Sequence, residues 1–207
     1  MKRSLVAVLL SLLCIGAFAQ KKKDALILYQ HRNYKEAISV CEEELREDPT
    51  RVEAFVVLCW SLVGNGEYAR AEQRAYEGLK LSRYDIRLIE VLGEAKYYLE
   101  KNEEALKQFQ EYISIANDRT GDRVGPAYYF MGEIYIRETK FQHADIALSA
   151  AVRKNPHSDL WWFRLGYARE MAKNYAESLT AYEECLKLNP TRDEAVRGKE
   201  RVKEHLR

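Results

Sequence analysis

The chain has few of the residues that interrupt helices or cross-link small folds. Its 207 residues include only 10 Gly, 4 Pro and 4 Cys. Four cysteines in a chain of this length are too few for a disulfide scaffold. The shortage of glycine and proline favours helices over a fold rich in tight turns.

The chain also lacks an excess of charge of either sign. The 33 Lys and Arg residues balance 32 Asp and Glu residues, which leaves a formal net charge of +1. The chain therefore lacks the basic field typical of nucleic-acid-binding proteins, and no nucleic acid is expected among its partners. A hydrophobic share of 47% with 31% charged residues excludes a wholly disordered chain and predicts a single helical globular domain.

The N-terminus differs from the rest of the chain. Lys2 and Arg3 precede an uncharged apolar run over residues 5–17, which ends in the small residues Ala17 and Ala19. This pattern predicts a signal peptide over residues 1–19, and hence a protein exported to the periplasm of a bacterial envelope. The alternatives are an uncleaved anchor, for which the run is short, and a lipoprotein acylated at Cys14. After removal of the signal, no stable membrane insertion is expected.

The remaining sequence is repetitive. Small residues recur at separations of 34, 34, 39 and 34 residues, at Ala37, Ala71, Ala105, Ala144 and Ser178. A second marker has the same period, because proline follows three of these residues after 12 positions, at Pro49, Pro156 and Pro190. A period of 34 residues with one insertion of five indicates a repeat architecture.

Each repeat is predicted to be a pair of helices joined by a tight turn. In the second repeat, helices over residues 52–63 and 68–81 flank the breaker Gly64-Asn65-Gly66. The fifth repeat has helices over 160–171 and 176–188. Such a pair cannot bury both its faces alone, so neighbouring pairs must stack on one another and form a continuous core.

These repeats resemble the tetratricopeptide repeat family. The fifth repeat carries signature residues at Trp162, Leu165, Gly166, Tyr175, Tyr182 and Pro190, and the fourth at Met131, Gly132, Tyr135, Phe141, Ala144, Ala151 and Pro156. The third has Leu92, Gly93, Ala105 and Phe109, with Lys96 where an aromatic residue is usual. The second has Leu58, Gly66, Tyr68 and Ala71, and the first has Ala25, Tyr34, Ala37 and Pro49.

The resemblance implies an all-α fold, a right-handed α-solenoid of five helix-turn-helix units. Their frames are 18–51, 52–85, 86–119, 125–158 and 159–192, and a capping helix is expected over 191–207. The first frame begins inside the predicted signal, so its first helix should be short. The segment 117–126 holds the five-residue insertion and is interpreted as a plain connecting loop.

No catalytic pattern is present in the sequence. The histidines His31, His143, His157 and His205 form no metal-binding spacing, and there is no nucleophile elbow, P-loop or dinucleotide fingerprint. Paired glutamates such as Glu103-Glu104 and Glu183-Glu184 are interpreted as solvated helix faces. The sequence therefore predicts neither enzyme activity nor a metal or cofactor.

Three cysteines remain after removal of the predicted signal. Cys41, Cys59 and Cys185 are expected in the core. A Cys41–Cys59 bridge stays open as an alternative, although stacked helices usually lie farther apart than a disulfide permits.

The resemblance also implies that the first helices of successive units line a concave groove for a peptide. The matching places are Tyr29, Val56, Trp60, Glu90, Glu94, Tyr97, Tyr98, Tyr129, Glu133, Arg137, Phe163 and Tyr167. Aromatic residues there would anchor a partner. Glu90, Glu94 and Glu133 would repel a carboxylate and favour a basic residue of that partner.

The expected function is that of a non-catalytic scaffold of the bacterial envelope that binds a protein or peptide partner. Two alternatives remain open. One is a carrier of a small apolar ligand or lipid within a periplasmic transport system, and the other is a structural subunit of an envelope assembly complex. The pattern names neither the partner nor the oligomeric state.

Overall fold

The computed structural model describes residues 24–116 and 121–207, and every regular element in this part of the chain is an α-helix. The eleven helices of these residues are α1 (Ala25–Gln30), α2 (Tyr34–Glu47), α3 (Val52–Gly64), α4 (Tyr68–Leu81), α5 (Ile86–Tyr98), α6 (Asn102–Ile115), α7 (Val124–Arg137), α8 (Phe141–Lys154), α9 (Asp159–Met171), α10 (Tyr175–Leu188) and α11 (Asp193–His205). The all-helical prediction is confirmed. The predicted signal peptide lies outside the described residues.

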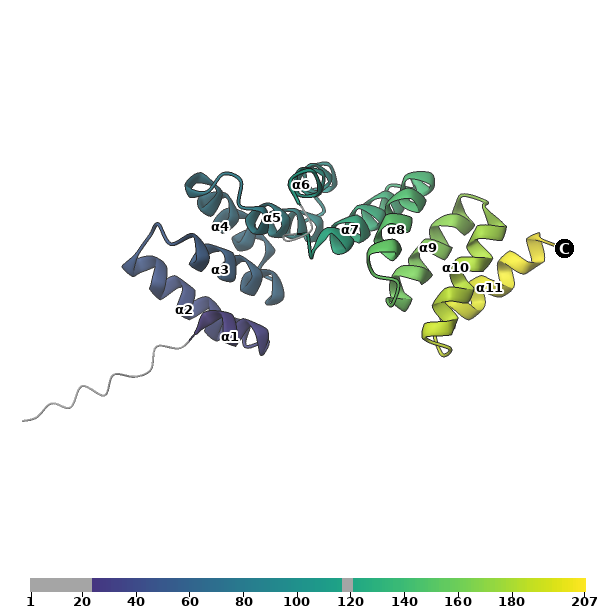
Figure 1. Ribbon diagram of the computed structural model, residues 1–207, viewed down its shortest axis with the longest axis horizontal. Helices are drawn as coiled ribbons and strands as arrows, with labels where there is room; N and C mark the ends of the chain where they lie inside the picture. Colours follow the sequence, from purple (N-terminus) through teal and green to yellow (C-terminus); the bar gives the residue numbers. More distant parts are fainter. Residues whose placement is uncertain (1–23, 117–120) are drawn as a thin grey trace, which may run out of the picture.

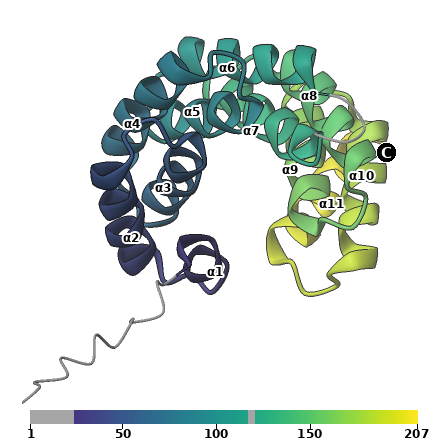
Figure 2. The ribbon, with the colours of Figure 1, turned by 60° about the vertical axis from the view of Figure 1, so that its left-hand side comes forward.

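The helices form consecutive antiparallel pairs that stack into a curved solenoid (Figure 1). Figure 2 shows α3, α5, α7 and α9 on the inner side of the curve and α4, α6 and α8 on the outer side. The short helix α1 lies at the inner edge of one end, and α11 packs on α9 and α10 at the other. The odd-numbered helices therefore build the concave face.

The repeat period is also visible in the backbone. One residue in each intra-pair turn has a positive φ: Arg32, Gly66, Glu100, Thr139 and Lys173. The next residue in each turn donates its N–H to a carbonyl five residues earlier, as Asn33 does to Leu28 and Lys140 to Tyr135. This pattern is the Schellman helix end, in which a left-handed residue follows the last helical turn. Only one of the five turns uses glycine there.

Close helix contacts depend on small residues at the places that the period predicts. Ala37, Ala71, Ala105, Ala144 and Ser178 are at most 1% exposed. Glycines in the first helices press against large side chains of the second: a Cβ added to Gly132 would lie 2.5 Å from Cγ of Leu148. Gly93 with Phe109 and Gly166 with Tyr182 repeat this arrangement. In the second pair the sizes differ, since Cys59 and Ala75 occupy the corresponding places and are fully buried.

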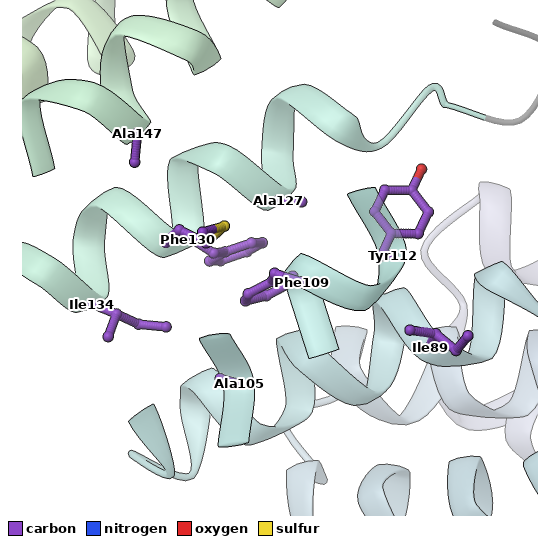
Figure 3. Packing of buried hydrophobic residues seen from close by; sticks show 9 residues of the cluster. Ile89, Ala105, Phe109, Tyr112, Ala127, Phe130, Ile134 and Ala147 are labelled. Carbon is purple, nitrogen blue, oxygen red and sulfur yellow. The ribbon is translucent and has the colours of Figure 1, made fainter. Parts of the chain in front are cut away.

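The insertion between α6 and α7 does not divide the core. Buried side chains from α5, α6, α7 and α8 meet in one cluster, which includes Phe109, Tyr112, Phe130 and Ile134 (Figure 3). The rings of Phe109 and Phe130 stack with centroids 5.5 Å apart. The Tyr112 hydroxyl accepts a hydrogen bond from the backbone N–H of Arg123 at 3.2 Å, so the buried end of α6 also fixes the start of α7.

The C-terminal helix is tied to the last pair by a polar cluster around the buried carboxylate of Glu170. Ala195, Gly198 and Val202 of α11 are buried. Arg201 donates two hydrogen bonds to the carboxylate of Glu170, at 2.7 and 2.9 Å. The Tyr182 hydroxyl donates a third at 2.6 Å. This helix covers the end of the apolar core, as a capping helix must.

Glu104 lies on a solvated helix face, as the sequence predicts, and its side chain is 58% exposed, yet it has a buried partner. Glu104 forms an ion pair with Lys96, whose side chain is only 1% exposed. Glu72 lies 3.3 Å from the same ammonium group, and the Tyr76 ring lies beneath it. A buried lysine requires such partners because an unpaired charge in the core is costly. Lys96 thus fills its aromatic-type position with its aliphatic stem, and Glu104 neutralises its end.

The three cysteines of the described residues are free thiols and are buried. Burial raises the pKa of the Cys41 thiol to about 12 and that of Cys185 to about 11. Thiols with such pKa values are poor nucleophiles at neutral pH. The Cys59 thiol donates to the carbonyl oxygen of Ala71 at 3.7 Å, which places it at the contact between α3 and α4.

Candidate functional site

The concave face holds a cavity of about 990 Å³ in its N-terminal half. Its walls come from α1, α3 and α5, and the end of α6 and the turn before α7 complete it. A cavity of this size reaches the upper end of the range typical of ligand sites, about 300–1,000 Å³. It has room for several side chains of a partner.

One wall of the cavity is aromatic. Tyr29 of α1 stacks on Trp60 of α3, with ring centroids 5.6 Å apart and an angle of 30° between the planes. Tyr34 lies beside Tyr29 at 5.9 Å, and Tyr84 adds a further exposed ring to the lining. Tyr29 and Trp60 lie 31 positions apart in the chain and meet only because α1 and α3 are neighbours on the inner side.

The opposite part of the cavity is charged. Arg123 donates from Nε to Oε1 of Glu90 at 3.0 Å and from Nη2 to Oε2 of Glu94 at 2.8 Å. The Glu90 side chain is 2% exposed, and burial raises its pKa to about 7, which the nearby Arg123 charge only partly offsets. Burial also raises the pKa of Glu94. Two carboxylates therefore share one guanidinium.

Two sequence predictions about this face need correction. Val56 is fully buried and belongs to the core between α3, α4 and α5, so it is no part of the surface. The predicted groove glutamates are not unpaired, because the carboxylates of Glu90 and Glu94 both accept hydrogen bonds from Arg123. Glu133 receives a hydrogen bond from Arg164 at 2.5 Å. Stacking of the next pair covers Val56, and arginines one unit further along the chain reach back to the glutamates.

The middle of the concave face carries a second aromatic group. Tyr97 packs on Phe130 at 4.8 Å and edge-on against Tyr98 at 5.1 Å. The Arg137 guanidinium lies over the Tyr97 ring at 4.7 Å. Tyr129 stacks on Trp161 of α9 at 5.4 Å with 12° between the planes. The structure thus brings Tyr97, Tyr98, Tyr129, Glu133 and Arg137 together on α5 and α7.

Phe163 and Tyr167 are not part of either aromatic group. Phe163 lies 6.3 Å from the Tyr182 ring, and Arg192 lies over its other side. It therefore packs toward α10 and α11. Tyr167 meets Phe141 edge-on at 6.4 Å and lies under Arg164. These two predicted positions continue the inner side toward the C-terminus but do not join the cavity.

Sequence reasoning missed four residues that shape the face, namely Tyr34, Tyr84, Arg123 and Trp161. Arg123 lies in the insertion, outside every repeat frame, so no family position indicates its role. Tyr84 lies in the turn between two units. Trp161 was overlooked because the adjacent Trp162 occupies the signature position of the repeat. A second tryptophan beside the signature residue is nevertheless a pattern that could have indicated an additional role. Trp162 donates its indole N–H to the carbonyl of Pro156 at 2.9 Å.

Within residues 24–116 and 121–207, no His, Cys, Asp and Glu side chains gather as a metal site would require. None of the helices described is both long and apolar enough to cross a bilayer.

The comparisons with known proteins agree with the geometry. Residues 160–192, which hold α9 and α10, match the family model of the tetratricopeptide repeat. The matched residues form the fifth helix-turn-helix unit. The other helix pairs share its turn geometry and its small contact residues, so the described chain has the architecture of a tetratricopeptide repeat solenoid.

Two curated relatives are similar to parts of the chain. The tetratricopeptide repeat-containing protein trd-1 of Caenorhabditis elegans is 29% identical over 85 residues, 41% of this chain and 11% of that protein. The peroxisomal targeting signal receptor of Saccharomyces cerevisiae is 26% identical over 176 residues, 79% of this chain and 28% of that protein. The chain thus spans less than a third of either relative's length.

Solved structures show the same fold. The structure of YrrB, described as a TPR protein with an unusual peptide-binding site, superposes with a TM-score of 0.67. The match covers 85% of this chain and 88% of YrrB at 17% sequence identity. At that identity the likeness establishes the solenoid fold and nothing finer.

Proposed function

We propose that the protein is a non-catalytic interaction scaffold that holds a segment of a partner protein on its concave face. The observation that carries this proposal is the cavity of about 990 Å³ between α1, α3 and α5, with the stacked Tyr29 and Trp60 in its wall. Solenoids use their extended concave surfaces for binding. Large aromatic side chains at such a place are the usual anchors of a protein partner.

The aromatic residues of this face exceed what the repeat core requires. The core between α5, α6, α7 and α8 is already filled by buried side chains such as Phe109, Tyr112 and Ile134. Tyr98 is 42% exposed and Tyr84 is 66% exposed. Exposed aromatic surface of this kind is typical of a surface that a partner covers. The names of two similar proteins, a targeting signal receptor and a TPR protein with a peptide-binding site, support a peptide as the occupant.

A carrier of a small apolar ligand fits this cavity less well. Glu90, Glu94 and Arg123 would have to face the ligand, and burying their polar atoms against hydrocarbon is unfavourable. A peptide offers the polar groups that such a surface can hydrogen-bond. Denaturing mass spectrometry of the purified protein would reveal a retained lipid or metabolite as additional mass, and such mass would favour the carrier.

The bacterial envelope is the proposed location, and its support is the charged start and apolar run of residues 1–19. Export would make Gln20 the first residue of the mature protein. Intact-mass measurement of the protein recovered from its native cells tests this, because a mass of the full chain in the cytosol would contradict both the signal and the location.

Site-specific photo-crosslinking tests the scaffold function. Trp60 in the cavity wall is replaced by p-benzoylphenylalanine, and Ile146, a 72% exposed residue of the outer helix α8, receives the same probe as a matched control. The proposal expects a specific crosslinked partner from position 60 and none from position 146. Crosslinks of equal yield from both positions, or from position 146 alone, would place binding elsewhere.

A further inference from the structure

The cavity on the concave face has an excess of negative charge. Among the described residues that line it, the carboxylates are Asp85, Glu90, Glu94 and Asp122, whereas the basic side chains are Arg87 and Arg123. Each guanidinium is already shared by two carboxylates, so neither arginine can neutralise a further acid. The lining thus carries two negative charges more than positive ones when all groups are ionised.

The contacts of Arg87 show this sharing directly. Its Nη2 donates to Oδ2 of Asp85 at 2.7 Å and to Oε1 of Glu53 at 2.9 Å, and its Nη1 donates to Oε2 of Glu53 at 2.8 Å. Asp85 also caps α5 by accepting from the backbone N–H of Arg87 at 3.0 Å. Arg87 is therefore held at the rim of the cavity and does not turn toward Glu94.

The groups around Glu90 come from four elements. Glu94 lies on the same helix, Arg123 reaches it from the turn before α7, and the hydroxyls of Tyr29 on α1 and Tyr112 on α6 lie within electrostatic reach. Burial, with a smaller contribution from the charge of Glu94, raises the pKa of Glu90 to about 7 against the opposing effect of Arg123. One positive charge is thus not enough to stabilise both carboxylates fully.

An aromatic wall faces this acidic floor. Tyr29 lines the same cavity as Arg123, Glu94 and Glu90, and its hydroxyl is within electrostatic reach of all three. Trp60 stacks behind it. A cation that enters the cavity would meet carboxylates on one side and electron-rich ring faces on the other, and both attract it.

We propose that this cavity binds an arginine side chain of the partner segment. The inference rests on the proposed peptide-binding function and specifies its chemistry. A guanidinium is planar, so it can stack on Tyr29 or Trp60 while its N–H groups donate to Glu94, which lysine cannot do in the same way. The occupant is a side chain of a peptide, and a free cationic metabolite is an alternative that the test separates.

The test uses the Trp60 indole N–H resonance at pH 8, where Glu90 is ionised. The probes are capped pentapeptide amide pools with a fixed central residue: arginine, its neutral analogue citrulline, or glutamate. The arginine pool should shift the Trp60 signal in a saturable manner, while the signal of Trp162, whose indole N–H is bound to the Pro156 carbonyl, serves as an internal reference. The citrulline and glutamate pools should cause no saturable shift, and 0.5 M salt should weaken the arginine effect.

Three variants separate charge from structural damage. Glu94→Gln removes an acceptor and should weaken binding of the arginine pool roughly fivefold. Arg123→Gln removes the competing internal cation and should strengthen it. Glu43→Gln, at an exposed position of α2 outside the cavity, should leave it unchanged. Opposite effects of the first two variants cannot arise from a common loss of folding.

Several results would overturn this inference. These are equal shifts with arginine and citrulline, equal weakening by Glu94→Gln and Arg123→Gln, or a shift with spermidine but none with the arginine pool. The proposed function fails in a different way. If a captured partner is lost with Tyr129→Ala but binds the Glu94→Gln protein normally, the scaffold role stands and the arginine pocket is wrong. If the arginine pool binds but the captured partner binds the Trp60→Ala protein with unchanged affinity, the scaffold role fails.

Discussion

Nη2 of Arg123 lies 2.9 Å from Oε1 of Glu90. The arginine side chain is 49% exposed, whereas the glutamate side chain is only 2% exposed. This contact joins the insertion between α6 and α7 to the buried floor of the concave cavity. The insertion is therefore more than a longer connection, because Arg123, directly before α7, supplies the one basic group that reaches both Glu90 and Glu94 in the described structure.

The buried carboxylate makes stability depend on pH. The pKa of Glu90 is raised to about 7 in the folded protein, chiefly by burial, above its ordinary value of 4.5. The folded state thus binds more protons than the unfolded state between these two pH values, so the Glu90 contribution falls as pH rises from about 4.5 to 7. Glu90→Gln should raise the melting temperature at pH 8 and change it little at pH 4.5.

The control for this prediction is Glu43→Gln, at an exposed position of α2. Scanning calorimetry of both variants at pH 4.5 and 8 checks it. A melting temperature of Glu90→Gln that falls at pH 8 would mean that the ion pair with Arg123 outweighs the cost of burying the charge.

The contact of Gly132 with Leu148 predicts a compensating pair. Gly132→Ala introduces a Cβ at 2.5 Å from Cγ of Leu148 and should destabilise the protein by about 1–3 kcal/mol, the usual cost of overpacking. Leu148→Ala should cost less stability in the Gly132→Ala chain than in the natural chain, since Cys59 with Ala75 shows that a larger first residue fits a smaller second one. Urea denaturation of the single and double variants gives the coupling energy, and strict additivity would contradict the contact.

The left-handed turn residues predict a stabilising substitution. Thr139 has φ 58°, a conformation that β-branched residues rarely adopt. Thr139→Gly removes backbone strain of about 1–2 kcal/mol from the folded state. The greater conformational entropy of glycine in the unfolded chain costs about 0.5–1 kcal/mol of this gain in stability. The melting temperature should rise by a few degrees. Gly66→Ala, at φ 79° in the equivalent turn, should lower it, and equal signs for both variants would refute the strain argument.

The buried Lys96 predicts a conditional effect at Glu104. Glu104→Gln should lower the melting temperature in the natural chain, because it removes an ion-pair partner of a side chain that is 1% exposed. In a Lys96→Met background the same change should have no effect. Thermal unfolding of the four combinations checks this dependence, and an equal effect of Glu104→Gln in both backgrounds would contradict the pairing.

The sequence predicts the repeats well because their determinants are local. Ala71 and Gly132 occupy fixed places in a period of 34, where the packed neighbouring helix leaves room only for a small residue. The short α1 also follows from the frame. The pairing of Lys96 with Glu104 was missed because the lysine occupies a position where the repeat usually has an aromatic side chain, and size alone does not reveal its partner.

The candidate site is less predictable for a physical reason. A repeat position indicates which way a residue points from its own helix but not what the neighbouring unit places over it. Val56 and Trp60 both hold groove positions, yet packing of α5 covers only Val56. Arg123 belongs to no repeat position, and its role depends on where the insertion ends.

The measurement that tests the central claim most directly is the affinity of the crosslinked partner for three versions of the protein. These are the natural chain, Trp60→Ala in the cavity wall, and Ile146→Ala on the outer helix α8, each checked for folding by circular dichroism. A concave binding surface predicts a loss of at least about 2 kcal/mol with Trp60→Ala, as expected for an aromatic anchor, and none with Ile146→Ala. Unchanged affinity with Trp60→Ala in a folded protein would contradict it.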